Sequence, residues 1–167
     1  MTKLILALVL TCGPQLTAQD MSSCSMHKDM KSEHQMGVET HGDAAMGFPH
    51  DTTTHHFRLA ADGGAIEVTV NDAKDIANIA AIRSHLTHIA TMFSDGNFSI
   101  PMFVHSEVPP GVTEMKDRRS EISYKFEELP GGGRIRIATK NRDALNAVQD
   151  FLRFQIKDHH TGDVEQP

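Results

Sequence analysis

Apolar and polar residues alternate in two parts of the chain, and a stripe of apolar residues at helical spacing follows each alternation. In the first part, Phe57 and Leu59 alternate with polar neighbours, residues 62–64 supply a turn, and apolar residues alternate again over 66–70. This pattern predicts a β-hairpin. A helix capped by Asn71 or Asp72 and reaching about residue 93 should follow, with a core stripe of Ile76, Ile79, Ile82, Leu86, Ile89 and Phe93.

The same plan returns in the second part of the chain. Ile122, Tyr124 and Phe126 alternate, residues 130–133 turn the chain, and Ile135 and Ile137 lead into a second helix capped by Asn141. The core stripe of that helix is Leu145, Val148, Phe151, Leu152 and Ile156. A shift of 69 residues superposes the two patterns. The sequence therefore predicts a duplicated ββα unit, with repeats at about 55–96 and 121–160.

Two such units would bury both helical stripes if four antiparallel strands formed one sheet with both helices on one face. The predicted fold class is therefore α+β, a two-layer sandwich over residues 55–163, followed by a C-terminal tail, 164–167. The pattern leaves the strand order open.

The N-terminus has the features of an exported protein. Lys3 precedes the apolar run 4–10, and Ala18 supplies a small residue at a cleavage position, which predicts a signal peptide over 1–18. We therefore expect a periplasmic or secreted protein, with lipoprotein processing at Cys12 as an alternative. Cleavage after Ala18 leaves Cys24 as the remaining cysteine, so the mature chain cannot form an internal disulfide.

Composition narrows the possible functions. With 167 residues the chain is too short for a TIM barrel or a two-domain enzyme, and no apolar run is long enough to span a membrane. A net charge of -6 without a basic stripe argues against a nucleic-acid partner. The unusual counts are 11 His and 9 Met, because both residue types ligate metals.

Residues 19–54 hold many of these ligands. They show neither strand nor helix periodicity, which predicts a disordered tail rich in Met and His. Thioethers and imidazoles at short spacing suit Cu(I), because soft sulfur ligands prefer soft ions. The candidate tail ligands are Met26, His27, Met30, His34, Met36 and His41. They would capture copper loosely.

The predicted domain has its own candidate ligands. His85, His88 and Met92 form a stripe on the flank of the first helix, and His residues at i and i+3 can share one metal. On the first strand, His55 should face the core with Phe57, and His56 should face outward with Arg58. Met102 and His105 follow in the connecting stretch. If these side chains converge, they would bind Cu(II) or Zn(II).

The remaining chemical signals are weak. His159 and His160 end the second helix, where a cation is favoured by the helix dipole, so a capping role is the default. No nucleophile elbow, phosphate loop or dinucleotide fingerprint is present. An enzymatic activity is therefore less expected than a binding function.

Four segments, THHFRLAADGGAIEV, IRSHLTHIATMF, PMFVHSEVPPGV and FLRFQIKDHHTGD, together resemble an uncharacterised family of small exported bacterial proteins. The resemblance covers roughly residues 46 to 163. Some members carry the label aspartate carbamoyltransferase, which this sequence does not support, because the two α/β domains and the Ser-Thr-Arg-Thr phosphate loop of that enzyme are missing. The resemblance implies a common domain without a mechanism.

Three functional hypotheses follow. The first is a periplasmic protein that binds copper for resistance or for delivery, with a periplasmic metal-handling protein as the partner in delivery. The second is a haem-binding protein or a small metalloenzyme that uses the same histidines. The third is a non-catalytic interaction domain, which would use the open face of the sheet and its charged residues, Arg58, Glu67, Lys125, Glu127, Arg134 and Arg136.

Overall fold

The computed structural model describes the backbone of residues 25–167 and the side chains from Glu33 onward. The predicted signal peptide, Cys12 and Cys24 lie outside the described residues. The α-helices are α1 (Ser25–Met46), α2 (Ile76–Ser94), α3 (Ser99–His105), α4 (Val112–Asp117) and α5 (Arg142–Asp158). The strands are β1 (Thr53–Ala60), β2 (Gly63–Val70), β3 (Ile122–Leu129) and β4 (Gly132–Thr139), and short 3-10 turns, η2 (His50–Thr52) and η3 (Arg119–Glu121), precede β1 and β3.

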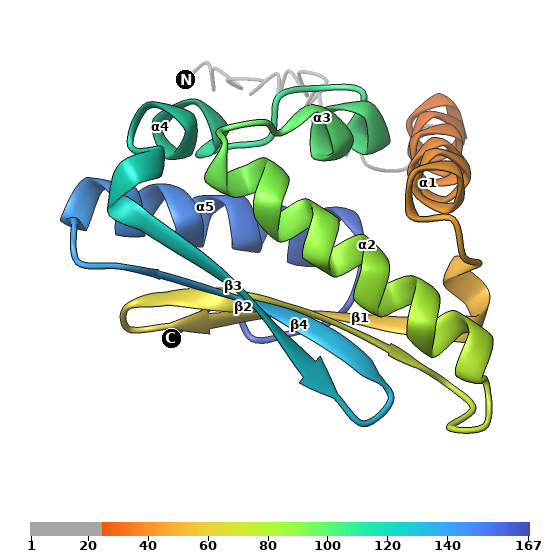
Figure 1. Ribbon diagram of the computed structural model, residues 1–167. Helices are drawn as coiled ribbons and strands as arrows, with labels where there is room; N and C mark the ends of the chain where they lie inside the picture. Colours follow the sequence, from red (N-terminus) through yellow and green to blue (C-terminus); the bar gives the residue numbers. More distant parts are fainter. Residues whose placement is uncertain (1–24) are drawn as a thin grey trace, which may run out of the picture.

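The four strands form one antiparallel sheet in the order β1-β2-β4-β3. Helices α2 and α5 cover the same face of this sheet, and α3 and α4 lie beyond them, away from the strands (Figure 1). Helix α2 packs mainly on β3 and β4, whereas α5 packs mainly on β1 and β2. Each helix thus crosses to the hairpin of the other repeat. The predicted α+β two-layer sandwich is confirmed, and this crossing interlocks the repeats around one core.

The duplication is visible in the strand bounds. A shift of 69 residues carries β1 onto β3 and β2 onto β4, residue for residue. Ile66 and Ile135, which this shift superposes, are also direct partners across β2 and β4. The two halves are therefore related by an approximate two-fold axis through this pair. Both side chains are buried in the core.

The start of α2 differs from the prediction. Asp75 caps the helix by accepting a hydrogen bond from the Asn78 N–H, so the helix begins later than Asn71 or Asp72 would have placed it. Ile76 consequently sits in the first turn, where it is 69% exposed, and does not join the core stripe. Asn141 caps α5 as predicted, accepting from the N–H groups of Asp143 and Ala144.

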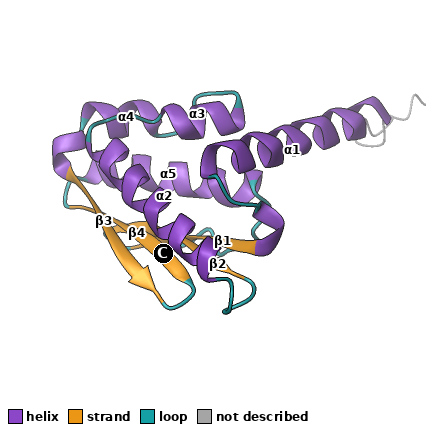
Figure 2. Ribbon diagram, turned by 45° about the vertical axis from the view of Figure 1, so that its right-hand side comes forward, coloured by secondary structure: helices purple, strands orange, loops and turns teal. Residues whose placement is uncertain are grey.

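The prediction of a disordered tail is wrong for residues 25–46, which form α1. This helix packs against α3, and it extends away from the sheet and the other helices (Figure 2). Its inner side presents Gln35, Val38, Gly42 and Met46, at helical spacing, but only Val38 and Met46 among these are large and apolar. The periodicity was hidden because a glycine and a polar residue occupy half of the inner positions.

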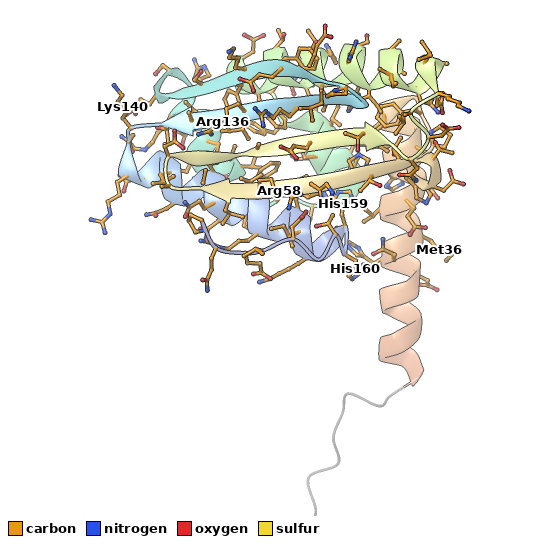
Figure 3. All side chains as sticks on the ribbon, turned by 90° about the horizontal axis from the view of Figure 1, so that it is seen from below. Met36, Arg58, Arg136, Lys140, His159 and His160 are labelled. Carbon is orange, nitrogen blue, oxygen red and sulfur yellow. The ribbon has the colours of Figure 1, made fainter. Side chains whose placement is uncertain are left out.

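The open face of the sheet carries a ladder of ion pairs. Glu67 lies 3.8 Å from Arg58 and 3.5 Å from Arg134, which reaches Glu127 at 2.7 Å. Lys125 pairs with Glu127 at 3.4 Å, and Arg136 pairs with Asp62. Figure 3 shows the sheet from this side, with Arg58 and Arg136 labelled. The charged side chains of the open face, which the interaction-domain hypothesis assigned to a partner, therefore pair with one another and with Asp62.

Candidate functional site

A cavity of about 360 Å³ lies between the two layers near the start of β1. The sheet, α2 and α5 form its inner walls, and α1 and α3 close its outer side. Six of the chain's 11 histidines line it: His50, His55, His56, His85, His105 and His159. They come from η2, β1, α2, α3 and the end of α5, so tertiary folding gathers residues that are scattered over 110 positions of the sequence.

His55 faces the cavity from β1, as the alternation predicted. Its ring stacks on the His159 ring, with centroids 6.2 Å apart and planes 8° from parallel. Burial is the largest of the causes that lower the pKa of His55 to about 4, followed by the charges of His85, His50 and His56. The imidazole is therefore neutral at pH 7, with a lone pair on one ring nitrogen.

His85 faces the cavity from the opposite wall, on α2. Its ring meets the Phe48 ring edge-on at 5.8 Å. Burial, followed by the charge of His88, lowers the pKa of His85 to about 4. Two neutral imidazoles, His55 and His85, thus approach one cavity from a strand and from a helix.

His159 ends α5, where the sequence predicted only a helix cap. Its ring packs on Phe57 at 5.5 Å and meets the His105 ring at 5.0 Å. Burial is the largest of the causes that lower the pKa of His159 to about 3, followed by the charges of His105 and His55.

His105 has a different environment, because both its ring nitrogens are engaged. Nδ1 lies 2.5 Å from the Asp158 carboxylate and Nε2 lies 3.0 Å from the Gln155 side-chain oxygen. The other Asp158 oxygen lies 2.8 Å from Nε2 of His34 on α1. Burial raises the pKa of Asp158, but the hydrogen bonds from His34 and His105 outweigh it and leave the pKa below its ordinary value. Asp158 thereby links α1, α3 and α5.

Carboxylates also engage His50 and His56. Asp43 accepts from the backbone N–H of His50 and lies 2.9 Å from its Nδ1. Asp163 lies 2.9 Å from Nδ1 of His56 and also accepts from the N–H of Phe57 on the edge strand β1. Both histidines act mainly as structural ties, although their rings border the cavity.

The predicted ligands of the domain converge only in part. His55, His56, His85 and His105 line the cavity, but His88 is exposed on α2, and Met92 packs against the core. Met102 is 40% exposed on α3. The predicted stripe of His85, His88 and Met92 thus contributes one residue to the cavity. His85 lines it, whereas His88 points to solvent and Met92 packs against the core.

The tail residues fall into two groups. Met26, His27 and Met30 lie in the part of α1 whose side chains are outside the described residues. Among the others, Met36 is 58% exposed and His34 is held by Asp158. His41 packs its ring against Phe103 at 4.8 Å. His34 and His41 therefore dock α1 on the body.

Within residues 33–167, no group of three or more His, Cys, Asp or Glu side chains is arranged to hold a metal ion. Met46, whose thioether is a soft ligand, lines the cavity together with His55 and His85. Sequence reasoning also missed the cavity residues Gln155, His50 and His159. No spacing rule indicates them, since His50 falls in the segment 19–54 that was predicted to be disordered and His159 was predicted to cap a helix.

No family model matches the chain, and comparisons with curated proteins and with solved structures give no match either. The resemblance to small exported bacterial proteins remains a prediction. None of the helices in the described part of the chain is long and apolar enough to cross a membrane.

Proposed function

We propose that the protein is an exported copper-binding protein that holds one Cu(I) ion in the cavity. The proposed ligands are the imidazoles of His55 and His85 and the thioether of Met46. The observation that carries the proposal is that two neutral imidazoles, His55 on β1 and His85 on α2, line the same cavity. The predicted signal peptide supports a role in periplasmic copper resistance or delivery.

The chemistry of this ligand set favours Cu(I) over divalent ions. Structural zinc sites use four ligands, whereas Cu(I) accepts two or three soft or imidazole ligands. A single positive charge also costs less to bury than a double one. Glu39, whose carboxylate borders the cavity, would balance one charge. We therefore expect tight Cu(I) binding and weak zinc binding.

The experiment is a Cu(I) titration of the mature chain from Gln19 under ascorbate, in competition with a chromophoric chelator such as bicinchoninate. One equivalent should be lost in His85→Ala and retained in His88→Ala. His88→Ala is a matched control, because both histidines lie on α2 but only His85 lines the cavity.

A chain that starts at Glu33 tests whether tight copper binding needs the first part of α1. It lacks Met26, His27 and Met30 but keeps the residues of α1 that border the cavity. It should retain the one tight equivalent. Loss of that equivalent, or equal binding by His85→Ala and the unchanged chain, would refute the cavity site.

A further inference from the structure

The cavity is much larger than one ion needs. Its volume of about 360 Å³ compares with the roughly 30 Å³ that one water molecule occupies in the liquid. Pockets for small organic molecules begin at roughly 300 Å³. The cavity therefore has room for an organic molecule whether or not a metal is bound.

The inner walls are apolar. Buried side chains from three elements face the space: Phe57 of β1, Leu86, Ile89 and Phe93 of α2, and Phe151 of α5. Among the described residues that line the cavity there is no Lys or Arg, and Glu39 carries the only carboxylate. Such walls favour an uncharged molecule with an apolar body.

Gln155 is one of the buried polar side chains in the wall, together with Thr53 and His105. Gln155 is 4% exposed and lines the cavity from α5. Its Oε1 accepts from Nε2 of His105 at 3.0 Å, and its Nε2 has no hydrogen-bond partner among the described residues. Turning the amide over exchanges the two atoms, and in either orientation one of them is left without a partner.

A buried polar atom without a partner is costly unless a ligand supplies one. A hydroxyl group satisfies either end of the Gln155 amide, because it both donates and accepts. The Oε1 of Gln35, on the α1 wall, is likewise buried without a partner within the described part of the chain. The lining therefore holds two amide side chains, those of Gln155 and Gln35, that each have an atom for a ligand to satisfy.

We propose that the cavity binds an uncharged organic molecule with an apolar, ring-sized body and a hydroxyl group that hydrogen-bonds to Gln155. This binding does not depend on the proposed copper site, so it is tested on metal-free protein.

The probe is N-phenyl-1-naphthylamine, whose emission rises in apolar surroundings, added to the full mature chain after removal of metal. It should bind one molecule per chain and be displaced by 4-ethylphenol and by ethylbenzene, which differ by the hydroxyl group. In Gln155→Met the ratio of the two affinities should shift about tenfold toward ethylbenzene, the size of one hydrogen bond. Gln149→Met is the matched control, because Gln149 lies on α5 but outside the cavity.

Three results would overturn the proposal: no rise in emission, an unchanged ratio in Gln155→Met, or undiminished probe binding in Ile89→Trp, which fills the cavity. Thermal melts of each variant establish that it is folded. The two proposals fail separately, since His85→Ala should lose copper yet keep the probe, and Gln155→Met should keep copper.

Discussion

The two repeats share a backbone plan but differ in what fills the corresponding positions. The 69-residue shift places His55 on Tyr124 and His85 on Phe154. His55 faces the cavity, whereas Tyr124 packs edge-on against the Phe93 ring, with centroids 5.7 Å apart. Phe154 packs its ring against the His105 ring, with centroids 4.9 Å apart. The second repeat thus has packed aromatic rings where the first repeat has imidazoles that line the cavity.

This difference shows that the repeated scaffold does not depend on the residues that line the cavity. The strands, their register and the two-fold axis are common to both halves, and they need only apolar residues at the right spacing. The cavity needs imidazoles at positions where the other repeat has larger aromatic rings. Copying residues from one half to the other is therefore the sharpest way to test the site.

The largest effect is expected when His55→Tyr and His85→Phe are combined, which copies the second half into the first. Cu(I) titration should show loss of the tight equivalent, because both imidazole ligands are gone. Filling the space should also raise the free energy of unfolding by about 0.5–2 kcal/mol in urea.

The control for this exchange is His88→Lys, which copies Lys157, the residue 69 positions later. His88 is exposed, so neither copper binding nor stability should change. If the double variant still bound copper as the unchanged chain does, the asymmetry between the halves would have no connection with metal binding.

The next effect concerns pH. The pKa values of His55 and His85 are about 4 in the folded protein, against an ordinary value of 6.5. Between these values the unfolded chain binds protons that the folded protein does not. Stability of the metal-free protein is thus fully present above pH 6.5 and is lost as pH falls toward 4.

His159, with a pKa of about 3, adds to the same loss. A tenfold difference in proton affinity corresponds to about 1.4 kcal/mol, so the decline should reach a few kcal/mol. Urea unfolding at pH 7, 5.5 and 4.5 measures it. The double variant His55→Tyr/His85→Phe should show a flatter dependence, and an equally steep one would mean that other groups cause the loss.

The smallest effect is expected at Tyr124, in the second repeat. The Tyr124 hydroxyl is buried with no hydrogen-bond partner among the described residues, and burial raises its pKa. Tyr124→Phe removes this polar group and keeps the ring, so unfolding free energy should stay the same or rise by up to about 1 kcal/mol. Copper binding should be unchanged. A clear loss of stability would show that the hydroxyl has a partner, such as an ordered water.

The sequence by itself determined the duplicated scaffold. Strict alternation around Ile66 and Ile135, followed by stripes at helical spacing, is enough to predict strands, helices and the 69-residue shift. These patterns reflect burial on one face, which each element shows locally. The inward direction of His55 and the capping role of Asn141 follow from the same local rules.

Only the tertiary structure decided which polar side chains meet. His105 finds Asp158 and Gln155 some 50 residues later, and this occupies the ring nitrogens that the sequence offered to a metal. Helix α1 forms where periodicity is weak, because docking through Val38 and the contact of His34 with Asp158 supply what its own pattern lacks. The cavity was beyond sequence reasoning for the same reason: its lining residues come from α1, η2, β1, β2, α2, α3 and α5, and no short segment records the space between them.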